Sequence, residues 1–328
     1  MAIFGLIQAV IFGVLLSCFE VDRNHYLAAI HDKHRWLSER KPPRVVLLGG
    51  SSAAFGFDSP RLRDQTGLNP VNMSLTAPLG MGFMLNDIAS ELQPGDIVIL
   101  SFEYEHFLED VTGWRDVMIM LEQRPQSFWK FELQQQKLVF DRALHHMGRI
   151  IHFNTARLRG QEPEPASLHL VRSAFNEFGD AVAHHKLPPP KELLHTGPMP
   201  SFDARLARRE IEKINQFVRT CRKRSIRVFY GHPQIEREKF ELNQEQIDQI
   251  ASLMDRLFDR VPLTRPAETV YGRDEFFDTV YHPNPEVKIK RTTLLAKRLN
   301  AAMDAATPSP LPKISDPPAL PQSHPSRP

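Results

Sequence analysis

The chain has 328 residues, 41% hydrophobic and 24% charged, so it can bury a core and is neither wholly disordered nor a transporter with many membrane spans. Its 41 Lys and Arg nearly balance 39 Asp and Glu, which leaves a formal charge of +2 and no electrostatic footprint for nucleic acid. Two cysteines, Cys18 and Cys221, are too few for a disulfide scaffold or a four-cysteine metal site.

The N-terminal residues 2–19 form an uncharged, mostly apolar run. Its length is at the short end of what a transmembrane helix needs, and it predicts a single membrane anchor over residues 1–20. A cleaved signal peptide and a buried core helix are the alternatives, although a basic start and an Ala-x-Ala site are missing. Leu15–Cys18 also loosely resembles a lipobox. Basic residues such as Arg23 and Lys33 follow the run, which places the body in the cytoplasm under the positive-inside rule.

The body from about residue 44 alternates strands with helices. Residues 21–43 are predicted to form a connecting helix that ends at Pro42 and Pro43. Apolar, often β-branched runs predict buried strands at 44–48, 70–72, 97–100 and 226–230. Capping residues and helical spacing predict helices that start near 59 and that cover 80–92, 207–221, 247–257 and 286–303. This alternation indicates an α/β domain over residues 44–304 with a parallel sheet, whose ligands bind at the carboxyl ends of the strands.

Two segments depart from this alternation. Residues 111–200 contain Trp114, Trp129 and a run of prolines but no clear strand, which predicts a helical insertion. The insertion either covers the sheet or forms a lid over the substrate site. Residues 305–328 are rich in proline and poor in apolar residues, so we expect a disordered tail.

A glycine-led turn with two serines follows the first predicted strand, in the order Gly49, Gly50, Ser51 and Ser52. Such a turn can lift a serine clear of the sheet edge, where a base can activate it as a nucleophile. The turn is not a Gly-x-Ser-x-Gly elbow, because Ala53 stands at the second glycine. It also lacks the pattern of a phosphate loop or of a dinucleotide-binding turn. Taken alone, the turn favours a structural role over a catalytic one.

A second candidate motif precedes the last predicted helix, where Asp278 stands four residues before His282. A carboxylate beside an imidazole fixes the tautomer of the ring and stabilises the imidazolium that forms during acyl transfer. Such pairs are also common on protein surfaces without any catalytic role.

Together the two motifs resemble those of the SGNH/GDSL hydrolase superfamily, in which a strand leads into Gly-Asp-Ser and the C-terminal part supplies Asp and His. The resemblance covers residues 44–303 and implies a flavodoxin-like three-layer α/β/α sandwich. It implies Ser51 as nucleophile, His282 as base and Asp278 as the group that orients the base, with no cofactor. Membrane-anchored bacterial members act on acyl groups of envelope polymers. The resemblance therefore implies a single-pass inner-membrane protein with an extracytoplasmic domain that is an esterase or O-acyltransferase for an acylated carbohydrate or another ester.

The chain departs from the family pattern at several positions. Gly50 replaces the aspartate of Gly-Asp-Ser, and the Asp–His spacing is one residue longer than usual. An alignment shifted by one residue makes Ser52 the nucleophile, although Ser51 lies nearer the end of the strand. These differences leave a non-catalytic protein that binds an envelope polysaccharide or a partner protein as the alternative function.

The family pattern also includes groups that donate hydrogen bonds to the oxyanion. Gly80 and Asn72 belong to the segment expected to supply an oxyanion donor. Glu103 follows the strand after which the family has an asparagine, and an ionised carboxylate cannot donate a hydrogen bond. Tyr104 and His232 also follow predicted strands and are candidates for lining the pocket, or for a structural role. Other histidines, such as His145 and His146, lack the convergent spacing of a metal site, so no metal is expected.

Overall fold

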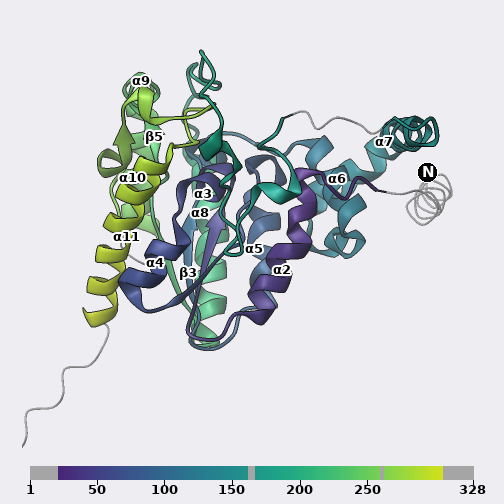
Figure 1. The fold of residues 1–328 in the computed structure, drawn as a ribbon. Coiled ribbons are helices and arrows are strands. Elements are labelled where there is room, and N and C mark those ends of the chain that lie inside the picture. The colour runs from purple at the N-terminus through teal and green to yellow at the C-terminus, as the bar shows by residue number, and fades with distance from the viewer. Residues whose placement is uncertain (1–20, 162–166, 259–261, 306–328) are drawn as a thin grey trace, which may run out of the picture.

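The computed structural model describes residues 21–161, 167–258 and 262–305. It is an α/β fold built on a parallel four-stranded sheet in the order β2-β1-β3-β4 (Figure 1). The strands are β1 (Arg44–Gly49), β2 (Asn69–Asn72), β3 (Ile97–Ser101) and β4 (Arg227–Tyr230). Two short strands, β5 (Ile235–Glu236) and β6 (Val270–Tyr271), form a separate parallel pair. The parallel sheet expected from the sequence is confirmed.

The apolar strand sequences are explained by burial on both faces of the sheet. Alternate residues of one strand enter two different hydrophobic cores: Val46 and Leu48 of β1 face one core, and Val45 and Leu47 face the other. Leu47 is paired with Ile99 in the central register of the sheet. Both faces must be covered by helices, which is the usual condition of a parallel sheet.

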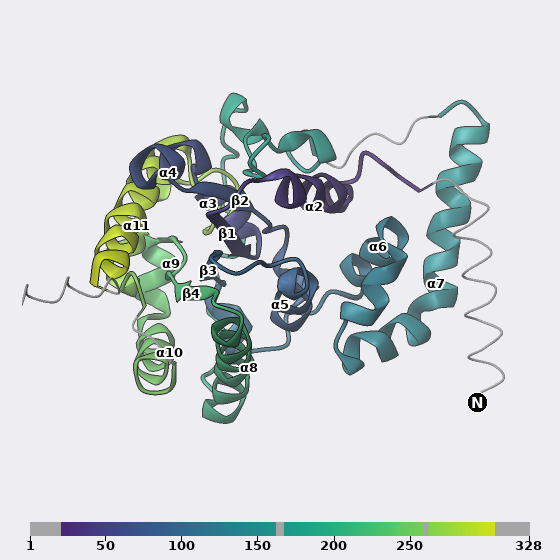
Figure 2. The same ribbon diagram turned by 90° about the horizontal axis from the view of Figure 1, so that it is seen from below.

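The part of the chain that the structure describes contains ten α-helices, most of which cover the two faces of this sheet. Their bounds are α2 (Ala29–Glu39), α3 (Ser51–Gly56), α4 (Ser59–Thr66), α5 (Met81–Ala89), α6 (Trp114–Gln123), α7 (Leu133–Leu158), α8 (Ala204–Lys223), α9 (Arg237–Leu242), α10 (Gln244–Leu257) and α11 (Pro285–Ala305). Helices α4 and α11 supply residues to one core, α2, α5, α6, α7, α8 and α10 supply residues to the other, and α3 supplies residues to both. Figure 2 shows this arrangement along the sheet.

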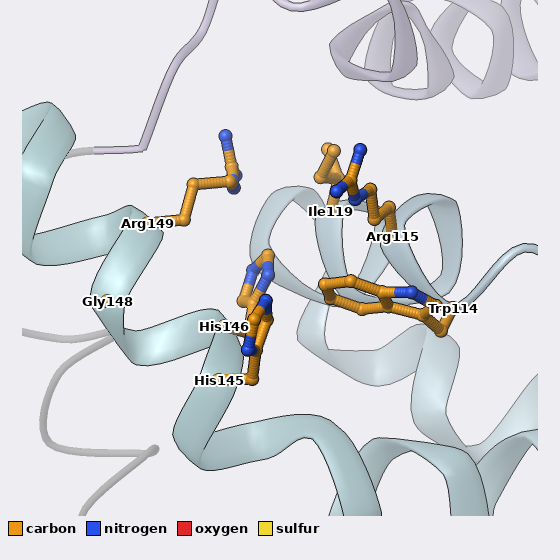
Figure 3. A pocket seen from close by; sticks show the side chains of 7 residues that line it. All are labelled: Trp114, Arg115, Ile119, His145, His146, Gly148 and Arg149. Atoms are coloured by element: carbon orange, nitrogen blue, oxygen red, sulfur yellow. The ribbon is translucent and has the colours of Figure 1, made fainter.

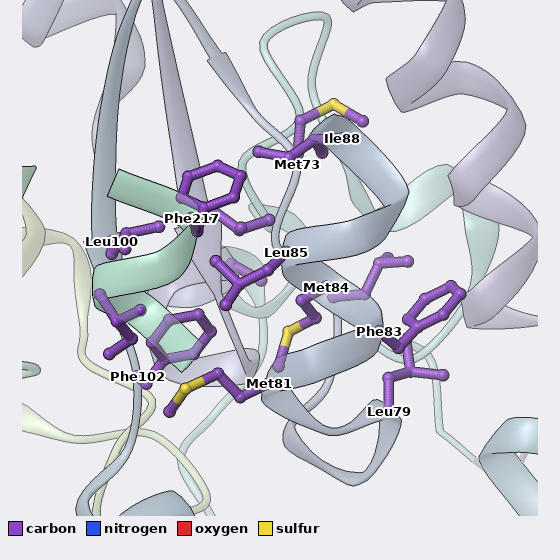
Figure 4. Packing of buried hydrophobic residues seen from close by; sticks show 14 of the residues in the cluster. Met73, Leu79, Met81, Phe83, Met84, Leu85, Ile88, Leu100, Phe102 and Phe217 are labelled. Carbon is purple, nitrogen blue, oxygen red and sulfur yellow. The ribbon is translucent and has the colours of Figure 1, made fainter. Parts of the chain in front are cut away.

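The larger core lies under α5 and α8. Figure 4 shows Leu85 of α5 packed toward Leu100 of β3 and Phe217 of α8, whereas Phe83 lies on the opposite side of α5. These side chains are almost completely buried, and burying each one stabilises the fold by about 1.5–3 kcal/mol relative to exposure. The packing fixes the sheet edge from which the site residues emerge.

Helix α2 is part of the body as well as a connection to it. Lys33 of α2 is fully buried, and its Nζ donates hydrogen bonds to the carbonyls of Asn72 at 2.8 Å and Gly179 at 2.6 Å. Burial lowers the pKa of this lysine to about 7, while Asp180 and Asp32 oppose the shift. The ammonium group therefore joins α2, the end of β2 and the insertion.

The insertion predicted at 111–200 consists mainly of α6 and α7, followed by irregular chain with short 3-10 turns. Helices α6 and α7 pack together at the side of the molecule opposite α11 (Figures 1 and 2). The irregular part returns to the sheet, where Ala181 N–H donates to the carbonyl of Ala54 at 2.9 Å. One part of the insertion thus lies away from the sheet edge and another part reaches it.

The structure differs from the sequence-based expectation directly after β1. The serine turn is the first turn of a helix, α3, whereas the sequence predicted a helix only from about residue 59. No helix among the described residues combines the length and apolar character needed to cross a membrane. The predicted anchor at 1–20 and most of the predicted tail at 305–328 lie outside the described residues.

Candidate functional site

The turn between β1 and α3 can form only because two glycines lack side chains. A Cβ on Gly49 would lie 1.9 Å from the carbonyl oxygen of Ser101, and one on Gly50 would lie 2.3 Å from a carboxylate oxygen of Glu103. The close approach lets the chain turn sharply from the strand into α3. Ser51 and Ser52 therefore occupy the first helical turn at the carboxyl edge of the sheet, where the sequence predicted a site.

The structure joins Asp278 to His282 within one tight loop before α11. His282 Nδ1 lies 2.7 Å from Asp278 Oδ1, and the hydroxyl oxygen of Thr279 accepts from the N–H of His282 at 3.1 Å. The bond at Nδ1 leaves Nε2 as the ring nitrogen that can accept a proton. Nε2 is buried and, among the described residues, makes no hydrogen bond.

A second histidine, His169 from the insertion, contacts the other oxygen of the same carboxylate. His169 Nε2 lies 2.9 Å from Asp278 Oδ2, and its Nδ1 lies 2.6 Å from the hydroxyl of Ser167. Burial alone would raise the pKa of Asp278. The hydrogen bonds with His169 and His282 outweigh burial and hold that pKa well below its ordinary value. Asp278 is therefore an ionised carboxylate held by two imidazoles.

His282 lies beside the helix that begins with the serines. Its ring stacks on Phe55 of α3 with centroids 3.9 Å apart and planes 7° apart. Phe55 is four residues after Ser51, on the same helix face, and long side chains on a helix point back toward the preceding turn. The side-chain amide of Gln234 also donates to the carbonyls of Ser52, at 2.8 Å, and Tyr281. One amide and one ring stack thus hold the serine turn beside the histidine loop.

The two serines differ in accessibility. Ser52 is completely buried, its N–H donates to Glu103 Oε1 at 2.7 Å, and its hydroxyl has no hydrogen-bond partner among the described residues. Ser51 is partly exposed. A substrate can reach Ser51 without moving α3, so these positions favour Ser51 as the nucleophile. The structure shows no hydrogen bond between Ser51 and Nε2 of His282.

Glu103 is an acceptor at the position where the resembled family has an asparagine. Burial alone would raise its pKa, but the nearby imidazole of His106 and the N–H of Ser52 lower the pKa below its ordinary value. His106 Nε2 lies 3.4 Å from Glu103 Oε2. The ionised carboxylate stabilises the N-terminal turn of α3 and cannot act as an oxyanion donor.

The structure does not offer Asn72 or Gly80 as free oxyanion donors. The amide of Asn72 donates to the carbonyl of Ala53 and to Asp180, each at 3.0 Å. The N–H of Gly80 donates to the carbonyl of Ala77 at 2.9 Å. Both groups therefore have internal partners, and Asn72 links β2 to α3.

Tyr104 and His232 lie in the core behind the sheet edge. Both are almost completely buried, and the Tyr104 hydroxyl lies 3.4 Å from Nδ1 of His232. Burial lowers the pKa of His232 to about 3, so its ring is neutral near pH 7. Their surroundings fit the structural role, which was one of the two roles predicted for them.

A separate pocket of about 380 Å³ lies between α6 and α7 (Figure 3). Its lining residues are Trp114, Arg115, Ile119, His145, His146, Gly148 and Arg149. None of them belongs to the serine turn or to the Asp278–His282 loop, and none is a serine or cysteine nucleophile. The candidate site is therefore placed at the sheet edge, by chemistry rather than by cavity size.

Three residues of the site were not predicted from the sequence. His169 lies in an insertion with no recognisable spacing to Asp278, and Gln234 is one amide in a loop. Phe55 had a signal, since it is four residues after Ser51, but only if α3 had been predicted. Sequence spacing could not show which distant side chain would reach the second oxygen of Asp278.

No protein-family model matches the chain, and no curated protein matches it. Within the described ranges, no group of three or more His, Cys, Asp or Glu side chains is placed to hold a metal ion. The chemical groups of the candidate site are the Ser51 hydroxyl, the imidazoles of His169 and His282, and the carboxylates of Asp278 and Glu103.

Proposed function

We propose that the protein is an SGNH-like serine esterase or O-acyltransferase that uses Ser51, His282 and Asp278. The observation that carries the proposal is the position of His282. Its Nδ1 is bonded to an ionised carboxylate, its Nε2 has no partner among the described residues, and its ring stacks on the helix that begins at Ser51. A buried polar atom without a partner calls for an explanation, and a general base awaiting its substrate provides one.

The proposed reaction begins with attack by Ser51 Oγ on the carbonyl carbon of an ester. His282 Nε2 takes the hydroxyl proton, and Asp278 stabilises the resulting imidazolium through Nδ1. The tetrahedral intermediate collapses as His282 returns the proton to the leaving alcohol, which leaves an acyl group on Ser51. Water or a sugar hydroxyl then accepts the acyl group, with His282 again acting as base.

The Ser51 N–H at the start of α3 supplies the oxyanion donor in this proposal, because the N–H groups of Ser52, Ala53 and Ala54 already have partners. The first N–H groups of a helix have no partner within the helix, and the Ser51 N–H is adjacent to the nucleophile. A side-chain donor is missing because Glu103 is an acceptor. Since one oxyanion donor contributes about 10²–10³ in rate, we expect slower turnover than a complete oxyanion hole would give.

The remaining parts of the proposal rest on the fold and on the resemblance. The strand order β2-β1-β3-β4 matches the first four strands of a flavodoxin-like sandwich, which supports that finer fold assignment.

We further propose that residues 2–19 anchor the chain in the inner membrane with the domain extracytoplasmic. O-acyl or O-acetyl groups of an envelope carbohydrate are then the proposed substrates.

One observation favours the alternative of a non-catalytic binding protein. Glu103 places a negative charge at the serine turn, and a negative charge there disfavours an oxyanion. In that case the exposed sheet edge would bind a polysaccharide or partner protein without covalent chemistry.

The experiment that separates the two functions is labelling of the full chain by a fluorophosphonate probe. We expect labelling of the parent protein and its loss in Ser51→Ala and, separately, in His282→Ala. Ser52→Ala is the matched control and should still label, because the Ser52 hydroxyl is sealed in the core. Absence of labelling in a parent protein with native circular dichroism would favour the binding function.

A further inference from the structure

Helix α7 exposes a straight apolar stripe that no described segment covers. Five large apolar side chains on it are 41–87% exposed: Leu133, Phe140, Leu144, Ile151 and Leu158. Their spacings of seven, four, seven and seven residues place them within roughly 40° of one another around the helix axis. The stripe runs along a helix about 39 Å long. It is separate from the inner face of α7, where Val139, Ala143 and Ile150 are buried.

Aromatic residues continue the stripe at the N-terminal end of α7. Trp129 is 79% exposed, and its ring packs edge-on against Phe128 at 5.2 Å. Phe128 in turn contacts Phe140 of the stripe at 5.9 Å. Exposed contiguous apolar surface of this kind marks an interaction site, and tryptophan is enriched where proteins meet a membrane interface.

The charge of α7 selects the type of partner. The helix contains four basic residues, Lys137, Arg142, Arg149 and Arg157, and one acidic residue, Asp141. Arg149 is paired with Glu122 of α6, so the other three basic residues still exceed the one acidic residue. An amphipathic helix with Lys and Arg beside an apolar face is the usual design of a helix that lies in the headgroup region of an anionic membrane. A second copy of the same cationic helix would instead bring like charges together.

The start of the described chain lies on the same side of the molecule. The carbonyl of Asp22 accepts from the side-chain amide of Gln123 at the end of α6, at 3.0 Å. The apolar run 2–19 joins the body directly before this point. The described chain therefore begins on the α6–α7 side, and the apolar run of residues 2–19 precedes that point in the sequence.

From these observations we propose that α7 lies in the plane of an anionic lipid surface, with its stripe and Trp129 inserted among the headgroups. Insertion would be about 5–10 Å deep, as for other interfacial helices. This contact orients the sheet edge relative to the membrane and does not depend on the chemistry proposed for Ser51.

The test is a depth measurement on the full chain in vesicles of phosphatidylcholine with roughly one quarter phosphatidylglycerol. Spin labels are attached to Leu144→Cys or Ile151→Cys in a Cys18→Ser background. Gln134→Cys and His152→Cys are matched controls, since both are exposed on α7 but lie outside the stripe. We expect the labels at 144 and 151 to be several-fold more accessible to oxygen than to a water-soluble nickel chelate, and the control labels to show the reverse.

Three outcomes would overturn the proposal, given native circular dichroism of each labelled protein. Equal nickel access at stripe and control positions would show that the stripe is in water. A cross-link between native Cys18 and Ile151→Cys would assign the stripe to residues 2–19. Spectral broadening that disappears on dilution with unlabelled protein would assign it to a second copy. Loss of oxygen access in pure phosphatidylcholine would support the role of anionic lipid.

Discussion

Asp278 illustrates how single side chains set the properties of the candidate site. Both of its oxygens accept from imidazoles, one from His282 in the same loop and one from His169 in the insertion. The contact with His282 alone would be enough to orient that ring, so the contact with His169 is additional. His169 therefore acts as a positioning residue that holds the carboxylate while Asp278 holds the base. The second contact also ties the insertion to the loop before α11.

We expect Asp278→Asn to lower the free energy of unfolding by about 1–3 kcal/mol at pH 7, because it replaces a charged acceptor of two buried hydrogen bonds. The pKa of Asp278 in the fold lies below its ordinary value of 3.8, so its ionised form stabilises the protein fully above that value. The contribution is lost as pH falls below 3.8 and through the folded-state pKa. Urea unfolding of the parent protein and of Asp278→Asn should be measured from pH 7 to pH 3. The difference between their free energies of unfolding should shrink only at the acidic end of this range.

Asp110→Asn is a suitable control for that measurement, since Asp110 is an exposed carboxylate whose two hydrogen bonds, from the side chain of Gln134 and from the backbone N–H of Thr112, are also exposed. Its effect should be small at every pH. An unfolding difference for Asp278→Asn that is constant down to pH 3 would contradict the assigned pKa shift.

At the scale of elements, the junction of β1 and α3 is the feature on which the site depends. The sheet edge, the serine turn and the histidine loop meet there because Gly49 lets the chain pass against β3 and Gln234 bridges the serine turn to the histidine loop. The helix that follows is short, so its position is fixed by these contacts rather than by its own stability.

Gly49→Ala should therefore destabilise the protein by at least about 2 kcal/mol, since the added methyl group meets the backbone carbonyl of Ser101, which cannot rotate away. Gly148→Ala is the matched control in α7, where no atom lies within 4 Å of the added methyl group. That change should stabilise the protein by about 0.5–1 kcal/mol. Thermal unfolding measures both, and similar effects of the two substitutions would disprove the close approach at Gly49.

The elements that could be predicted are those with strong local patterns. The four strands of the sheet have runs of apolar residues, and α8 and α10 have regular helical spacing, so local sequence was sufficient for them. Helix α3 was missed because six residues of Ser, Ala, Phe and Gly have neither period nor cap. The Asp278–His282 contact was predictable from a spacing of four residues, whereas His169 depends on how a long insertion returns to the sheet.

At the scale of the whole molecule, the α6–α7 pair lies at one side of the sheet and joins the larger core through apolar residues of α6 and through Val139 and Ile150 of α7. The sheet and α8 share a continuous apolar core. The inner face of α7 is weaker, because its buried residues include Gln135, Ala143 and His146 beside Val139 and Ile150. Local stability follows buried apolar contacts, so the two parts should open with different free energies.

Native-state hydrogen exchange should reveal that difference. We expect the amides of β1 and β3 to exchange only by global unfolding, and those in the middle of α7 to exchange at least about tenfold faster. Helix α8 is the internal control. It is also a long helix, but it buries Ile211, Ile214 and Val218 against the sheet, so it should exchange as slowly as the strands. Equal protection of α7 and α8 would show that the inner contacts of α7 are as strong as those of the core. The α6–α7 pair could not then serve as a part that adapts to a membrane surface while the site at the sheet edge stays rigid.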